Sequence, residues 1–333
     1  MLPNERAMEN EENSGEKPLL DWAMLLCPDS PRKRIKEWIV AGRFYLDGEP
    51  VTQAGLRLTD PGERLSFGKP DSAVSAWAHR KRIHSKLTLL YLDESLAIVD
   101  KAAGVLSVPA EGSARDASAL EILADHLNDP EGNALRKQIF GNQTVIQPLP
   151  VHRLDQYTSG LFCIAMNLEA RRNLIEQLRA HELIREYLAF VDGIPNPSEG
   201  TWKHHLEMDE RGYQQQLRPK PGPNTSEVVT HYRVEHSYPR KRVTQLRLRL
   251  ETGLKHQIRI QAAAEGLALI GDRSYHGATL QLLARGKSKL PFHLNRQALH
   301  AAALRLRHPK NGTELHFESP LPRDLADLEK RLS

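Results

Sequence analysis

The spacing of hydrophobic positions near the start of the chain predicts a small mixed domain. Ile35 and Ile39 recur at helical spacing, and basic side chains occupy another face of the same segment. Gly42 is placed to end this helix, and residues 43–46 and 63–67 have the pattern of short strands, with an Asp-Gly turn after the first. The pattern therefore predicts an amphipathic helix followed by strands, which is a small α/β unit.

From residue 86 onward, apolar runs of strand length mix with segments of helical spacing. The runs at 87–92 and 96–101 flank an acidic turn and predict a β-hairpin. Further strands are expected at 161–166, 185–191, 243–250 and 299–305, and helices at 119–127 and 168–181. Because strands and helices do not alternate strictly, the predicted fold class is α+β rather than a doubly wound parallel sheet.

Composition divides the chain into four segments. Residues 1–18 hold five glutamates against one arginine and one lysine, and we expect this acidic tail to be disordered. Residues 19–68 form the small domain, and residues 69–85 lack a sustained apolar period and are predicted to be a linker. The remainder, residues 86–333, is long enough for a second domain with a sizeable core.

The charge and cysteine content narrow the class of protein. The chain carries a net charge of +4, and without the acidic tail the rest carries +7. Such a body favours polyanionic partners, although charge alone fits an ordinary solvated basic surface equally well. No apolar run approaches the ~20 residues of a membrane span, and no signal peptide is recognisable. Cys27 and Cys163 lack metal-ligand spacing, so a reduced, cytoplasmic protein without a metal is expected.

The stretch His-Arg-Leu-Asp-Gln-Tyr-Thr-Ser-Gly at residues 152–160 is the strongest candidate for chemistry. It places the Asp155 carboxylate on a turn that leads into an apolar strand, which is a common position for catalytic groups. We expect His152 to hold the loop by hydrogen bonds and Thr158 to satisfy backbone groups of the turn. Gly160 would allow close packing.

This nonapeptide resembles the central motif of the RluA-type pseudouridine synthases, which reads His-Arg-Leu-Asp, two variable residues, then Thr-Ser-Gly. Five more segments resemble motifs of that family in the same order, at residues 99–104, 185–189, 252–260, 271–277 and 297–301. Two residues are replaced, because Ala102 stands where the family has a proline and Leu254 where it has an arginine. In the segment at 271–277 the glycine also comes one residue late, at Gly277. The resemblance implies a mixed, largely antiparallel sheet flanked by helices, and an isomerase that needs no cofactor or metal.

The resemblance also implies a role for individual residues. Asp155 matches the catalytic aspartate, Arg259 its guanidinium partner, and Tyr187 the tyrosine that lies against the base. Arg153 resembles the arginine that enters the space left by an extruded uridine, because a stacked base must be flipped out to react; a phosphate contact or salt bridge is the alternative. Whether the aspartate attacks the sugar or acts through a glycal is left open.

The small domain carries a second resemblance. Its order of helix, glycine, strand, Asp-Gly turn and final strand is similar to the RNA-binding domain named after ribosomal protein S-four. In that family the basic helix face lies on the RNA backbone, which implies RNA contacts by Arg32, Lys33, Lys36 and Arg43. A solvated amphipathic helix is the alternative.

Together these features imply a monomeric RNA pseudouridine synthase that works by base flipping. Large-subunit (23S) ribosomal RNA is the favoured substrate, because this N-terminal module is frequent among family members that act on it, and transfer RNA stays open. An inactive RNA-binding relative is a second hypothesis. A glycosidase or nucleosidase is a third, but it would require a second carboxylate, and the matched motifs contain no paired acid.

Overall fold

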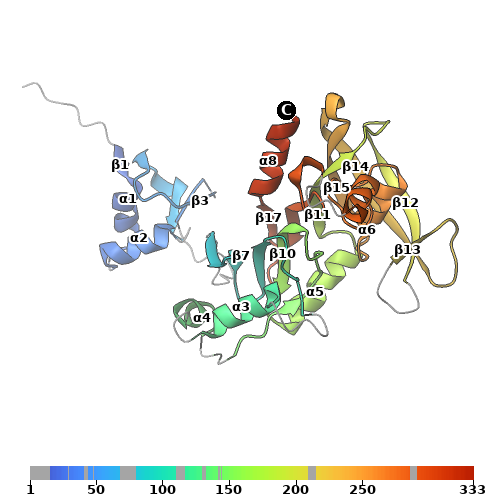
Figure 1. The fold of residues 1–333 in the computed structure, drawn as a ribbon. Helices are drawn as coiled ribbons and strands as arrows, with labels where there is room; N and C mark the ends of the chain where they lie inside the picture. The colour runs from blue at the N-terminus through green and yellow to red at the C-terminus, as the bar shows by residue number, and fades with distance from the viewer. Residues whose placement is uncertain are drawn as a thin grey trace, which may run out of the picture. The chain divides into compact units, whose positions relative to one another are not determined.

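The computed structural model describes residues 16–28, 30–40, 44–47, 49–67, 80–109, 117–129, 133–141, 143, 145–208, 215–285 and 291–333 (Figure 1). The chain separates into two compact units, Met1–Trp77 and Ala78–Ser333. Each unit has its own hydrophobic core, so each is described by itself.

The first unit packs two helices against short strands. The helices are α1 (Leu19–Leu26) and α2 (Arg32–Val40), and the strands are β1 (Glu16–Pro18), β2 (Phe44–Leu46), β3 (Glu49–Val51), β4 (Arg57–Thr59) and β5 (Leu65–Phe67), with a 3-10 turn, η1 (Gly62–Arg64), before β5. β2 pairs with β3 and β5, and β1 pairs with β4, all antiparallel. Ile35 and Ile39 of α2 are fully buried against Phe44, as the helical spacing predicted.

Two boundaries of the predicted segments need correction. Residues 1–15 of the expected disordered tail lie outside the described residues, but Glu16–Pro18 forms β1, because its backbone pairs with β4 and Glu16 contacts Arg57 at 3.6 Å. Most of the expected linker, residues 69–79, also lies outside the described residues. Lys81–His84 is not linker, because it forms strand β6 at one edge of the large sheet.

The second unit is built on a twelve-stranded sheet with the main order β13-β12-β14-β15-β11-β16-β10-β8-β7-β6, to which β9 and β17 add at β10 and β16. The strands are β6 (Lys81–His84), β7 (Leu87–Leu92), β8 (Leu96–Lys101), β9 (Leu149–Pro150), β10 (Ser159–Ala165), β11 (Ile184–Asp192), β12 (Glu199–Met208), β13 (Gln215–Arg218), β14 (Thr225–Tyr238), β15 (Val243–Leu250), β16 (Leu299–Arg307) and β17 (Glu314–Glu318). Among these strands only β10 and β16 pair in parallel. The predicted α+β class and the largely antiparallel sheet are therefore confirmed.

Helices flank the sheet (Figure 1). They are α3 (Ala119–Asn128), α4 (Asn133–Phe140), α5 (Leu168–Arg179), α6 (Gln257–Ala264), α7 (Gly277–Ala284) and α8 (Arg323–Leu332), with 3-10 turns η2 (Pro239–Lys241) and η3 (Pro291–His293). In α8, Leu325, Leu328 and Leu332 are buried and share a cluster with Phe190 of β11. Burying each such leucine stabilises the fold by about 1.5–3 kcal/mol.

Gly160 sits where the parallel pair begins, opposite Ala301. Its φ of +111° is disfavoured for other residues, and a Cβ at this position would lie 2.2 Å from the Ala301 carbonyl oxygen. Glycine is therefore required for β10 to approach β16. This close approach places the loop before β10 beside the residues before β16.

Candidate active site

The loop before β10 holds Asp155 at its centre. Leu154 is buried, and the hydroxyl of Ser107 accepts from its N–H and donates to its carbonyl, each at 2.9 Å. The Asp155 carbonyl then accepts from the Thr158 N–H at 3.0 Å, which closes a turn. These backbone bonds fix the loop on both sides of Asp155, whose side chain keeps 17 % exposure.

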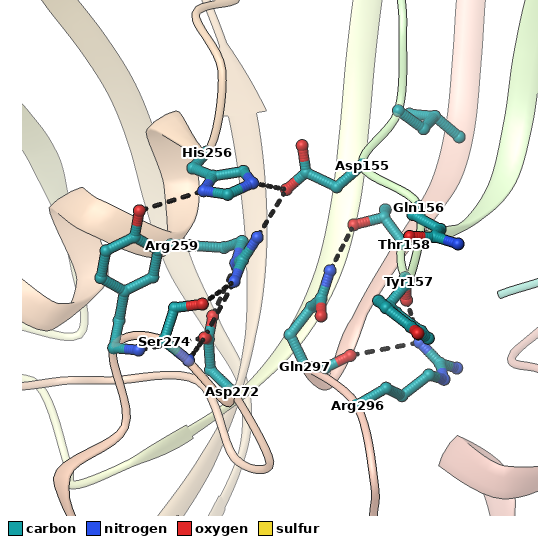
Figure 2. A network of polar contacts seen from close by, with 12 residues as sticks. Asp155, Gln156, Tyr157, Thr158, His256, Arg259, Asp272, Ser274, Arg296 and Gln297 are labelled. Carbon is teal, nitrogen blue, oxygen red and sulfur yellow. Dashed lines mark hydrogen bonds and ion pairs between the residues drawn. The ribbon is translucent and has the colours of Figure 1, made fainter. Parts of the chain in front are cut away.

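Arg259 joins Asp155 to a second, fully buried carboxylate. Its Nη1 donates to Asp155 Oδ2 at 3.3 Å, while Nε and Nη2 donate to the two oxygens of Asp272 at 2.7 and 3.0 Å. Ser274 and Tyr275 N–H groups donate to the same Asp272. Figure 2 shows the guanidinium between the two acids. Asp272 therefore orients the guanidinium, and one edge of it remains for Asp155.

His256 is a site residue to which the sequence interpretation gave no role, although it lies within the motif at 252–260. It precedes α6 in a left-handed conformation, with φ 58°, and its Nε2 lies 3.9 Å from Asp155 Oδ2. Its Nδ1 pairs with the Tyr275 hydroxyl at 3.0 Å. Burial lowers the pKa of His256, and the Asp155 charge opposes that shift. Asp272 likewise lies within a matched segment, at residues 271–277, and was assigned no role. A sequence alone does not show which arginine this acid contacts.

A pocket opens beside this network. Arg153, Asp155, Thr158, Tyr187 and Arg259 all line it, so five of the predicted site residues meet in one place. The Tyr187 ring is buried on β11, and burial raises the pKa of its phenol. Arg153, in contrast, is exposed and makes no ion pair within the described parts of the chain.

His152 supports the loop from behind. Its Nε2 accepts from the Cys163 N–H at 3.1 Å, and its ring meets Phe162 edge-on at 5.3 Å between centroids. Burial, assisted by the charge of Arg185, lowers the pKa of His152 to about 3, so the ring is neutral. These contacts tie the His152 ring to β10.

A further set of side chains holds the loop residues that follow Asp155. Lys101 is fully buried and donates to three carbonyls, among them that of Gln156 at 3.1 Å. Burial lowers the pKa of Lys101 to about 7. Arg296 donates to the Tyr157 carbonyl at 3.2 Å, and Gln297 donates to the Thr158 hydroxyl at 3.3 Å (Figure 2). The Thr158 hydroxyl thus binds a side chain, not the turn backbone that the sequence suggested.

The basic residues predicted to contact RNA lie in the first unit. Lys33 and Lys36 are exposed on α2, while Arg32, also exposed, donates to Asp21 Oδ1 at 3.2 Å. Arg43 lies outside the described residues. The exposed face of α2 is thus basic, but Asp21 partly neutralises the charge of Arg32.

Among the described residues, no group of three or more His, Cys, Asp or Glu side chains could hold a metal ion. In the same part of the chain, no helix is long and apolar enough to cross a membrane.

Comparisons with known proteins give matches to pseudouridine synthases. Residues 95–264 match the family described as RNA pseudouridylate synthase. The chain is 34 % identical to "Ribosomal large subunit pseudouridine synthase D" of Pseudomonas aeruginosa, over 96 % of this chain and 93 % of that protein. It is 31 % identical to the protein of the same name from Escherichia coli K12, over 93 % and 89 %. A solved structure, "Human RNA Pseudouridylate Synthase Domain Containing 4", shares the fold with a TM-score of 0.54 at 22 % identity, over 73 % of this chain and 92 % of that one.

Proposed function

The chain belongs to the RNA pseudouridylate synthase family and is an RNA-uridine isomerase, and we propose that Asp155 is its catalytic carboxylate and large-subunit (23S) ribosomal RNA its substrate. One observation carries the assignment of Asp155. Its partly exposed carboxylate faces a pocket that Tyr187 also lines, and Arg259 lies 3.3 Å from it. A charged acid, its counter-ion and an aromatic ring thus meet where a base can enter.

The reaction needs these groups and no redox agent. The C1′–N1 bond of uridine breaks, the base turns, a C1′–C5 bond forms, and the proton lost from C5 is balanced by one gained at N1. A carboxylate can serve by attacking the sugar or by accepting a proton on a glycal route. Arg259 would hold the Asp155 carboxylate in one orientation through either route, because Asp272 fixes the guanidinium.

Tyr187 and Arg153 would handle the base rather than the sugar. The buried ring of Tyr187 offers a flat apolar surface to uracil, and burial raises the pKa of its phenol, which keeps the hydroxyl protonated. Arg153 is exposed at the pocket and is free to occupy the gap that a flipped uridine leaves in the RNA. His152, Thr158 and Gly160 would keep the loop in place through the contacts described above.

The choice of ribosomal RNA rests on the relatives and on the first unit. Both bacterial relatives are named for the large ribosomal subunit and are covered over most of their length. Lys33 and Lys36 present positive charge on α2, which suits an RNA backbone. We propose that the protein acts in the cytoplasm as a monomer, with Arg32 and Arg43 adding to the same RNA contact.

Release of tritium from RNA labelled at uridine C5 tests the proposal. Wild type should release tritium from large-subunit ribosomal RNA, and Asp155→Asn should release none. Asp125→Asn is the matched control, because Asp125 is exposed on α3 and does not line the pocket. Release by Asp155→Asn at the wild-type rate would overturn the assignment of Asp155. Release from transfer RNA but not from ribosomal RNA would overturn the substrate, and release from neither would favour an RNA-binding relative without activity.

A further inference from the structure

Arg185 is a buried cation that pairs with no carboxylate among the residues that the structure describes. Its residue is only 8 % exposed. Nη2 donates to the Thr252 carbonyl at 3.3 Å, and the buried Nε has no acceptor among the residues that the structure describes. Among the same residues, no carboxylate lies at ion-pair distance from the Arg185 guanidinium. The neighbouring Glu186 pairs with Arg247 instead. Because a buried unpaired charge is costly, its presence requires a reason other than stability.

The position of Arg185 directs this charge toward the active-site pocket. Arg185 and Tyr187 lie two residues apart on β11, and both line the pocket with Asp155. Gly253 borders the same space, and a Cβ there would come within 2.6 Å of Arg185 Nη1. Glycine at 253 therefore leaves room for the guanidinium. Burial raises the pKa of Tyr187, and the charge of Arg185 opposes that rise, so the charge is felt at the pocket wall.

The acids of the site do not neutralise Arg185 by direct contact. Asp272 is fully engaged by Arg259 and by two backbone N–H groups. Asp155 contacts Arg259 and His256, and among the described residues it makes no ion pair with Arg185. The guanidinium thus retains donors for a ligand that enters the pocket.

We propose that Arg185 binds a phosphodiester group of the substrate RNA inside the pocket, at or next to the target uridine; this rests on the proposed function. A phosphate supplies the missing negative charge and several acceptor oxygens, and a guanidinium can bind it through two parallel hydrogen bonds. A uracil carbonyl would satisfy one donor but leave the charge uncompensated. Phosphate is therefore the ligand that the burial and the free donors of Arg185 favour.

Thermal unfolding gives the first test, with inorganic phosphate as the probe. Arg185→Met removes the charge and keeps an apolar stem, so its unfolding midpoint in chloride should equal or exceed that of wild type. Phosphate at matched ionic strength should raise the midpoint of wild type and leave that of Arg185→Met unchanged. A lower midpoint for Arg185→Met in chloride, or an equal response of both proteins to phosphate, would overturn the proposal.

Binding of large-subunit ribosomal RNA fragments gives the second test. All proteins carry Asp155→Asn so that no turnover occurs. Adding Arg185→Met should weaken binding about 10- to 100-fold, the size of a lost hydrogen bond to a charged group. It should also reduce the slope of log K against log salt by about 0.7, which is one phosphate contact on a single strand. Arg185→Lys should recover part of the affinity, because the charge remains without the fork.

Arg305→Gln is the matched control for net charge. Arg305 is exposed on β16, pairs across the sheet with Ile184, and does not line the pocket. Equal losses of affinity for Arg305→Gln and Arg185→Met would overturn the proposal. Tritium release is measured separately, in proteins that keep Asp155. A slower release by Arg185→Met without a change of salt slope in the binding test would also overturn it, because Arg185 would then act on Asp155 from a distance. A protein that binds RNA through Arg185 but releases no tritium would contradict the proposed function and leave this inference standing.

Discussion

Asparagine at Asp272 should destabilise the protein much more than asparagine at Asp155, although both acids contact Arg259. Asp272 is fully buried and holds Arg259, itself 7 % exposed in its side chain, through two hydrogen bonds. Removing one partner of a buried ion pair leaves the other charge uncompensated and costs about 3–5 kcal/mol. An asparagine amide would also direct N–H groups at the existing donors of Arg259 or of the loop at 274–275.

Asp155 differs because its loss leaves Arg259 paired. The Asp155 carboxylate is 17 % exposed and makes one 3.3 Å contact with the guanidinium. Replacing it should change the free energy of unfolding by about 1 kcal/mol at most. Asp155→Asn should therefore remain folded and inactive, whereas Asp272→Asn should lose stability, and its folded fraction should turn over more slowly because the guanidinium is no longer braced.

Urea unfolding followed by circular dichroism measures both effects, with Asp125→Asn as the surface control. Tritium release from the folded fraction supplies the activity. Equal destabilisation by Asp272→Asn and Asp155→Asn would refute the reasoning, as would an Asp272→Asn protein as stable as wild type. A double-mutant cycle with Arg259→Met adds a check, because the coupling energy should be large for Asp272 and small for Asp155.

Three further predictions concern the support of the loop. Gly160→Ala should destabilise the protein by about 3 kcal/mol or more in urea unfolding. The alanine Cβ would lie 2.2 Å from the Ala301 carbonyl oxygen, and the backbone φ at residue 160 is +111°. An unchanged free energy of unfolding would contradict this. Arg296→Met should lower kcat about tenfold or more and leave the affinity for RNA unchanged. The Tyr157 carbonyl would lose the Arg296 donor that lies 3.2 Å from it, and the loop that carries Asp155 would shift. A change in RNA affinity without a change in kcat would contradict this. The pKa of His152 is lowered to about 3, so the unfolded chain binds a proton first, and stability should fall as pH drops from about 6.5 toward 3. His152→Gln, which retains an acceptor, should flatten this dependence in urea unfolding at pH 7 and 4.5, and an unchanged dependence would contradict the assignment.

From the sequence, only those residues of the pocket could be predicted that match a position of a family motif. Asp155, Tyr187 and Arg259 come from three separate segments, and their resemblance to one family predicted that they would meet. Asp272 and Arg185 lie in the matched segments at 271–277 and 185–189. Residue types alone did not show that Asp272 braces Arg259, or that Arg185 has no acid at ion-pair distance among the described residues. Pairing of charges depends on side-chain distances, which residue types and spacing do not specify.

The fold shows a similar division between buried and exposed elements. β10 is buried along its whole length, and its unbroken apolar run predicted it. β12 and β14 were not predicted, although β14 runs from Thr225 to Tyr238, because few of its positions are buried and no apolar alternation is sustained. β6, at the sheet edge, has no buried residue and was taken for linker. Strands that are stabilised by backbone pairing more than by burial leave a weak pattern in the sequence.

The two departures from the family motifs have different consequences. Ala102 stands where the family has proline, and its N–H donates to the Lys86 carbonyl at 3.0 Å, a bond that proline could not make. In this chain a backbone hydrogen bond therefore restrains the turn, whereas the proline ring restrains it in the family motif. Leu254 stands where the family has arginine; it lines the pocket and packs against the cluster of Leu206, Val228 and Ile260. Leu254 therefore adds an apolar side chain to the pocket lining where the family motif has a basic one.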